Sequence, residues 1–206
     1  MEDLNMKKKM MLFVLMLVLS VPIFANAATF SFGGNIANHN DVVFINFSLT
    51  SDATNVRVWT DSFNGGGAAG GNFDPITALW TSTGNLLAQN DDDDSINPST
   101  QTYYDSGFSL PTLNAGSYMF SIACYNNFAN GTLLSDGFNY DGGTPIALGA
   151  WTNSDVSTIG LDPNIGTYWH VVLDGVDSAN QQVPEPASML LLGLGLAGLA
   201  TLKKKF

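Results

Sequence analysis

The clearest strand and turn signals of this chain lie in the stretch FDPITALWTSTGNLLAQNDDDD, residues 73–94. Mostly apolar residues fill 76–80 and 86–88, and each run has the length of a strand and is too short for a helix. Thr83-Gly84-Asn85 stand between the runs, and glycine with asparagine favours a tight turn. We therefore predict a β-hairpin that opens on Asp74-Pro75 and ends in an acidic loop.

Short apolar runs separated by turn residues continue on both sides of this hairpin. They lie at 30–36, 42–49, 56–59, 118–124 and 168–173. Gly, Asn, Asp and Pro cluster between them, and we find no stretch of ten or more residues that combines helical spacing with helix caps. Many short strands with polar turns are typical of antiparallel β-sandwiches and jelly rolls. The predicted fold class is all-β.

The charge of the central part argues against nucleic acid as a partner. The net charge of the chain is −11, but six of its seven basic residues lie in 7–9 and 203–205. Residues 28–183 hold 15 aspartates and no glutamate, and Arg57 is their one basic residue. No basic patch is present there to neutralise phosphates. An anionic polysaccharide would be repelled as well, unless a divalent cation bridged it.

Residues 1–27 have the three parts of a secretory signal peptide. Lysines at 7–9 precede an apolar run at 10–19, and the small-residue site Ala25-Asn26-Ala27 follows. The run is too short to span a bilayer, and it lacks the polar face of a surface helix. We predict a signal helix that enters the Sec translocon and that signal peptidase removes after Ala27.

Residues 184–206 have the pattern of a second processing segment. Pro184, Glu185 and Pro186 precede a sixteen-residue apolar stretch at 187–202 and the lysines at 203–205. The stretch is slightly shorter than a relaxed membrane span, and the lysines favour the cytoplasmic side of a predicted transmembrane helix.

This order of elements closely resembles the PEP-CTERM sorting signal. In that family an exosortase, a membrane transpeptidase of Gram-negative bacteria that make extracellular polysaccharide, recognises the tail near its Pro-Glu-Pro motif. The resemblance implies an exported protein whose precursor is held transiently in the inner membrane. It also implies a final location at the cell surface or in the extracellular matrix.

Between the two ends we predict one domain, residues 28–183. Its hairpin, its Asn-Asp-Asp loop and the later strand Ala115-Gly116-Ser117-Tyr118 resemble a recurrent family of exported bacterial proteins with Phe-Asp-Pro-Ile and Asn-Asp-Asp motifs. Those proteins are similar to the β-sandwich pre-peptidase C-terminal domains of secreted proteases. The resemblance implies a β-sandwich and no particular reaction.

The acidic loop is the candidate metal site, and its residues are Asn90, Asp91, Asp92, Asp93 and Asp94. Calcium takes about six to eight oxygen ligands, which a flexible acidic loop can supply. The EF-hand frame and its bidentate glutamate are missing, so other carboxylates, such as Asp74 or Asp105, would have to complete the site. The alternative interpretation is a solvated loop that binds no metal.

Catalysis has little support in the sequence, and we predict a non-enzymatic protein. His39, His170 and Cys124 are far apart along the chain, and no G-x-S-x-G nucleophile motif is present. Zinc would need clustered ligands, which these residues do not form in sequence. Two of the 15 aspartates could form the carboxylate pair that a glycoside hydrolase uses. Residues 28–183 contain no glutamate, however, which makes a general acid with a raised pKa less expected. The lone Cys124 is expected to be buried.

We expect a surface or matrix protein associated with exopolysaccharide or biofilm. The alternative is a calcium-dependent carbohydrate-binding module, because aromatic rings that face solvent can stack on sugars. The candidates for such stacking are Trp59, Trp80, Trp151, Trp169 and the pair Tyr103-Tyr104. Aromatic residues clustered on one exposed sheet face would favour the module, and two aspartates in a deep cleft would favour an enzyme.

Overall fold

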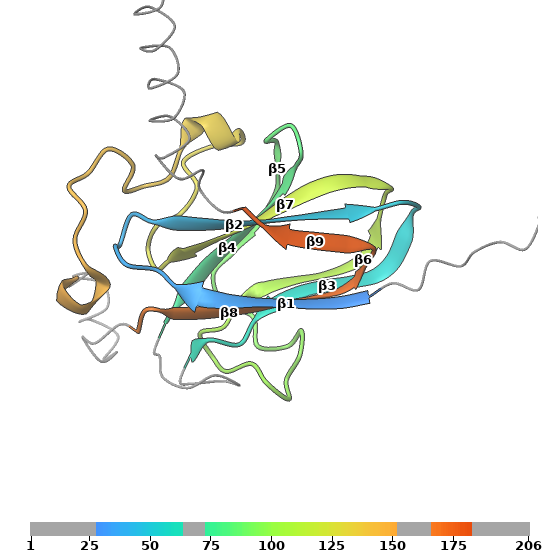
Figure 1. Ribbon diagram of the computed structural model, residues 1–206, viewed down its shortest axis with the longest axis horizontal. Helices are drawn as coiled ribbons and strands as arrows, with labels where there is room; N and C mark the ends of the chain where they lie inside the picture. The colour runs from blue at the N-terminus through green and yellow to red at the C-terminus, as the bar shows by residue number, and fades with distance from the viewer. Residues whose placement is uncertain (1–27, 64–72, 152–165, 183–206) are drawn as a thin grey trace, which may run out of the picture.

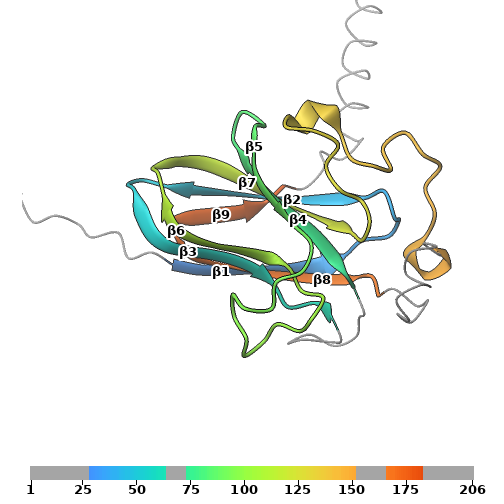
Figure 2. The same ribbon diagram turned by 180° about the vertical axis from the view of Figure 1, so that it is seen from behind.

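The computed structural model describes residues 28–63, 73–151 and 166–182, and these form two antiparallel sheets that face one another (Figures 1 and 2). The four-stranded sheet has the order β1 (Ala28–Asn35), β8 (Tyr168–Val176), β3 (Ala53–Thr60), β6 (Gly107–Leu113). The five-stranded sheet has the order β5 (Leu86–Asn90), β4 (Pro75–Thr81), β7 (Gly116–Cys124), β2 (Val42–Leu49), β9 (Ser178–Gln181). Two short 3-10 helices, η2 (Leu134–Asp136) and η3 (Leu148–Ala150), lie between β7 and β8. The predicted all-β sandwich is confirmed, and the signal and transmembrane helices that we predicted lie outside the described residues.

The hairpin that the sequence predicts joins β4 to β5. The two strands pair from Thr77 opposite Asn90 to Trp80 opposite Leu86. Gly84 occupies the turn with φ +82°, and its N–H donates to the carbonyl of Thr81 at 2.9 Å. Glycine adopts this left-handed backbone without strain, which explains the sharp reversal.

The main core lies between the sheets. The five-stranded sheet contributes Ile45, Phe120 and Ile122, and the four-stranded sheet contributes Val58 and Leu173, all fully buried. Strand β8 alternates buried and part-exposed residues over most of its length, as expected when one face packs on a core. Burial of each such side chain contributes about 1.5–3 kcal/mol.

Strand β4 is buried on both faces, which explains its nearly continuous apolar sequence. Its outer face carries Ala78 and Trp80, and Phe138 covers them from the segment after β7. The Trp80 indole N–H donates to Ser121 Oγ at 2.9 Å. This second cluster stabilises the outer face of the sheet and removes Trp80 from solvent.

The other tryptophans lie inside as well. Trp59 and Trp169 are buried, and half-buried Trp151 stacks on the His39 ring with centroids 4.0 Å apart. Cys124 is also buried, in agreement with the sequence prediction, and burial raises the pKa of its thiol to about 12. Within the described residues, therefore, no tryptophan is exposed for stacking on a sugar.

Candidate metal centre

The β4–β5 hairpin brings three carboxylates together. Asp74 stands directly before β4, and Asp91 and Asp92 directly follow β5. Because the strands are antiparallel, the start of one and the end of the other lie at the same end of the hairpin. One carboxylate oxygen from each residue lies within 4.8 Å of the other two. We refer to Asp74, Asp91 and Asp92 as the carboxylate cluster.

Asp74 is the innermost member of the cluster. It is only 4% exposed, and its Oδ1 has no hydrogen-bond partner among the described residues. Asp91 Oδ1 is likewise buried and unpartnered there. Buried polar groups in folded proteins are nearly always paired, because desolvating an unpaired carboxylate is costly. Three neighbouring carboxylates, two of which have an unpartnered buried oxygen, are a set of ligands suited to a cation.

The electrostatics of the cluster favour uptake of positive charge. Burial raises the pKa of Asp74 to about 8, and the charges of Asp92, Asp91 and Asp105 add to this effect. Burial, followed by the charge of Asp92, raises the pKa of Asp91 to about 6. Burial also raises the pKa of Asp92, and Asp105 and Asp94 contribute. A bound divalent cation would remove this repulsion.

The five residues of the predicted metal site, 90–94, differ in their positions in the structure. Asp91 and Asp92 belong to the carboxylate cluster, whereas Asp93 and Asp94 do not. Asn90 Nδ2 donates to the Gly107 carbonyl at 3.0 Å, and Asp93 Oδ1 accepts the backbone N–H of Ser95 at 2.9 Å. Asn90 and Asp93 are therefore engaged in holding the loop, and Asp94 is exposed.

Asp105 neighbours the cluster but has a structural role. Its Oδ1 accepts the N–H groups of Ser62 and Phe63 at 2.7 and 3.1 Å, and its Oδ2 accepts the N–H of Thr102 at 2.8 Å. Thr60 Oγ1 adds a further hydrogen bond. A carboxylate with this many donors has little capacity left for a metal, so Asp105 anchors the loop that follows the cluster.

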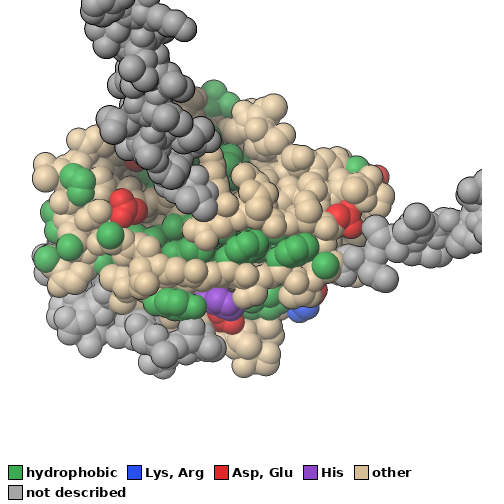
Figure 3. All heavy atoms as spheres, viewed as in Figure 1, with side chains coloured by type: hydrophobic (Ala, Val, Ile, Leu, Met, Phe, Trp, Pro, Cys, Tyr) green, Lys and Arg blue, Asp and Glu red, His purple; other side chains and the backbone are tan. Residues whose placement is uncertain are grey.

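A second polar array, which the sequence did not reveal, links three strands of the other sheet. His170 on β8 contacts Ser31 Oγ on β1 through Nε2 at 2.7 Å, and its Nδ1 pairs with Asp61, which follows β3. Figure 3 shows a histidine next to an acidic side chain on this face of the molecule. The array ties the edge strand β1 to β8 and to the end of β3.

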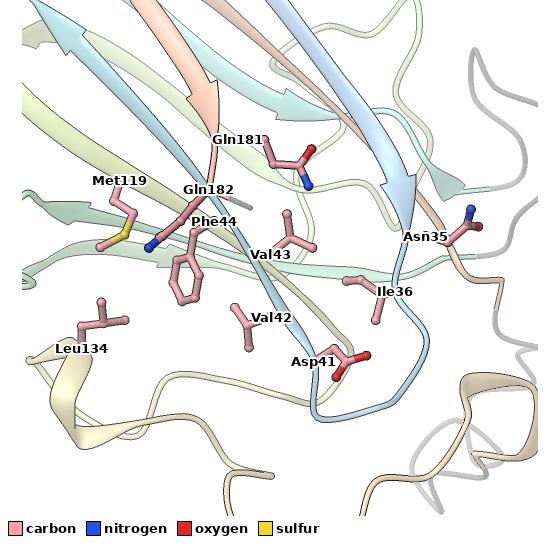
Figure 4. Close-up of a pocket in the computed structure, with 10 residues that line it drawn as sticks. All are labelled: Asn35, Ile36, Asp41, Val42, Val43, Phe44, Met119, Leu134, Gln181 and Gln182. Carbon is pink, nitrogen blue, oxygen red and sulfur yellow. The ribbon is translucent and has the colours of Figure 1, made fainter. Parts of the chain in front are cut away.

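An open groove of about 670 Å³ lies along the first half of β2, between the end of β1 and the outer face of the five-stranded sheet (Figure 4). Phe44, Val42 and Met119 give it an apolar floor, with Gln181 and Gln182 at one side. A neighbouring groove of about 620 Å³ has many serine and asparagine residues in its lining. Neither groove is lined by a member of the carboxylate cluster, by Ser31 or by His170.

Comparison with protein families gives a match to the tail of the chain. A model of the PEP-CTERM protein-sorting motif matches residues 182–205, which include Pro184, Glu185 and Pro186. No curated protein matches the chain. The resemblance of the body to the Phe-Asp-Pro-Ile family therefore stays a hypothesis.

Most of the matched tail lies outside the described residues, as do the predicted span 187–202 and the predicted cleavage site at Ala25 and Ala27. Within the described part of the chain, no helix has the length and hydrophobicity needed to cross a bilayer. The matched motif supports sorting of the chain by an exosortase. The chain is an exported protein that carries an exosortase sorting signal, and its membrane-anchored precursor is processed to the cell surface.

Proposed function

We propose that the exported body is a non-enzymatic surface or matrix protein that binds calcium through the carboxylate cluster. The observation that carries this proposal is the buried Asp74 carboxylate, which has an unpartnered Oδ1 among the described residues and an oxygen within 4.8 Å of oxygens of Asp91 and Asp92. Calcium suits the site because it accepts irregular sets of oxygen ligands, whereas magnesium demands near-ideal octahedral geometry. Extracellular modules bind calcium with Kd values of about 0.1–1 mM.

In this proposal, calcium stabilises the exported body at the cell surface. The ion would hold the start of β4 and the end of β5 together and would neutralise the most crowded charges of an acidic protein. We propose further that the body is associated with exopolysaccharide or biofilm. A strain lacking the gene should then form less matrix than its parent in calcium-containing medium, and equal matrix in both strains would contradict this association.

Replacing Pro184, Glu185 and Pro186 together by alanine should block processing of the tail. The exosortase would lose its recognition motif, so uncleaved precursor should accumulate in the membrane fraction while surface protein falls severalfold. Immunoblots of the two fractions with an antibody against the body measure this, and Gln181→Ala serves as the control. An unchanged amount of surface protein in the triple variant would show that the motif is not used.

The absence of enzyme activity is part of the proposal and is best tested at Ser31. Ser31 contacts His170, and His170 pairs with Asp61. The three residues are thus arranged like the nucleophile, the base and the orienting carboxylate of a catalytic triad. Acyl transfer also needs a substrate cleft and donors aimed at an oxyanion, and neither groove described above reaches Ser31. We expect the full chain and its Ser31→Ala variant to give the same background labelling with a fluorophosphonate probe. Labelling that disappears in the variant would mean that Ser31 is an activated nucleophile.

A calcium-dependent carbohydrate-binding module is the alternative function. One observation favours it: Tyr103, in the loop after the carboxylate cluster, is 69% exposed. The buried tryptophans give this alternative no support.

A further inference from the structure

Three aromatic rings form a shelf in the loops near the carboxylate cluster. The rings of Tyr103 and Tyr104 meet edge to face with centroids 4.8 Å apart, and Tyr104 packs on Phe63 at 4.5 Å. Tyr103 is the most exposed of the large hydrophobic side chains among the described residues. We call Phe63, Tyr103 and Tyr104 the aromatic shelf. Its outer ring presents a flat apolar surface of the kind that packs against a sugar.

Hydrogen bonds link the two chain segments that carry the shelf, the one at Phe63 and the one at 102–105. Asp105, directly after Tyr104, accepts the backbone N–H groups of Phe63 and Thr102 at 3.1 and 2.8 Å. Thr102 Oγ1 in turn donates to the Phe63 carbonyl at 3.2 Å. These bonds fix the backbone under all three rings, so a ligand that stacks on Tyr103 pays little of the entropic penalty of ordering a loop.

The same anchor joins the shelf to the carboxylate cluster. The backbone N–H of Asp93, next to Asp92, donates to the Asp105 carbonyl at 2.7 Å. The charges of Asp74 and Asp92 also contribute to the raised pKa of Tyr104, after desolvation and Tyr103. The loop that carries the shelf is therefore joined directly to the loop that carries Asp91 and Asp92.

The chemistry of such an ion points to a ligand with paired oxygens. Calcium takes about six to eight oxygen ligands, and three carboxylates leave several of these positions to be filled from outside. Vicinal hydroxyl groups of a sugar provide two neighbouring oxygens in a fixed geometry. The three ionised carboxylates together carry more negative charge than the calcium ion carries positive charge. The occupied site therefore stays slightly negative and disfavours a negatively charged uronate.

We propose that the carboxylate cluster and the aromatic shelf together bind a neutral polysaccharide, with calcium contacting a vicinal hydroxyl pair and Tyr103 stacking on the ring. This inference rests on the proposed calcium site and gives that site the carbohydrate-binding role named above as the alternative, with a neutral sugar as its ligand. It also places the sugar site at the end of the β4–β5 hairpin instead of on a sheet face or in the two grooves.

Affinity electrophoresis of the full chain in mild detergent tests the inference. Native gels would contain mannan or dextran as neutral probes, or alginate as the uronate probe, each with calcium or with the chelator EGTA. We expect a neutral probe to retard the protein only with calcium. Tyr103→Ala should weaken retardation about fivefold, as expected for loss of a stacking contact, and Tyr103→Phe should retain it. Leu87→Ala, which removes another exposed apolar side chain away from the shelf, is the matched control.

A calcium titration of the same variants separates the two proposals. Tyr103→Ala should bind calcium like the unmodified chain, because it leaves all three carboxylates in place. If calcium binds but neither neutral probe retards the protein, the sugar inference is wrong and the calcium proposal stands. Retardation that persists in EGTA, or that is stronger with alginate, would also overturn the inference. If calcium does not bind at all, both proposals fail.

Discussion

Calcium should raise the melting temperature of the full chain strongly at pH 8 and only slightly at pH 5. The reason is the pKa of Asp74, which burial and neighbouring carboxylates raise from 3.8 to about 8. In the metal-free protein, the folded state therefore holds a proton on Asp74 that the unfolded state releases. The contribution of Asp74 to stability is then greatest below about pH 4 and falls as the pH rises through the window from about 4 to about 8, by several kcal/mol in total. Calcium compensates for the lost proton, so its effect is largest where Asp74 is charged.

The variant Asp74→Asn separates this explanation from a general effect of salt. An amide cannot ionise, so the metal-free variant should show a smaller fall in melting temperature between pH 5 and pH 8 than the unmodified chain, with the part due to Asp91 remaining. It should also lose most of the calcium response. Asp94→Asn is the matched control, because Asp94 lies in the same loop, is exposed and is outside the carboxylate cluster. A full calcium response in Asp74→Asn would show that the ion binds elsewhere.

Gly107→Ala should destabilise the fold more than any other glycine substitution considered for this chain. A Cβ atom there would lie 2.2 Å from the Val58 carbonyl oxygen and 2.7 Å from Trp59 Cα, and both are backbone atoms of the paired strand β3. The backbone φ of +150° is also unfavourable for a residue with a side chain. We expect a loss of about 3 kcal/mol or more, because the clash can be relieved only by separating β3 from β6.

Urea unfolding of the full chain, monitored by tryptophan fluorescence, measures this loss. Gly142→Ala is the control, because Gly142 has φ +76° but open space within 4 Å of its added Cβ. The control should lose only about 1 kcal/mol from the left-handed backbone. The explanation would be wrong if both variants unfolded at the same urea concentration.

The hairpin and the fold class could be predicted because their determinants are local. Alternating apolar runs, the turn at Gly84 and the acidic residues after 90 are contiguous in sequence. Once the hairpin is drawn, Asp74 and Asp91 fall at the same end, so the carboxylate cluster follows from the register of neighbouring strands. Burial of Asp74, and the orphaned oxygens that make the cluster unusual, depend on how the rest of the sandwich covers that end.

Contacts between distant strands could not be predicted from the sequence. Ser31, Asp61 and His170 meet because β8, late in the chain, inserts between β1 and β3. No local pattern sets that strand order. The burial of Trp80 could not be predicted for the same reason. Trp80 lies on the outer face of its sheet and is covered by Phe138, which is far along the chain. The sequence analysis grouped the core tryptophans with Tyr103 as stacking candidates, because no local pattern separates a buried aromatic residue from an exposed one.

Isothermal titration of the full chain with calcium chloride at pH 8, in mild detergent, measures directly whether the carboxylate cluster binds calcium. We expect saturable binding with Kd in the range of about 0.1–1 mM. We also expect release of protons, detected as a heat that depends on the buffer, and loss of the signal in Asp74→Asn. A titration that gives no heat in any buffer, with no change in melting temperature, would contradict the proposed calcium site.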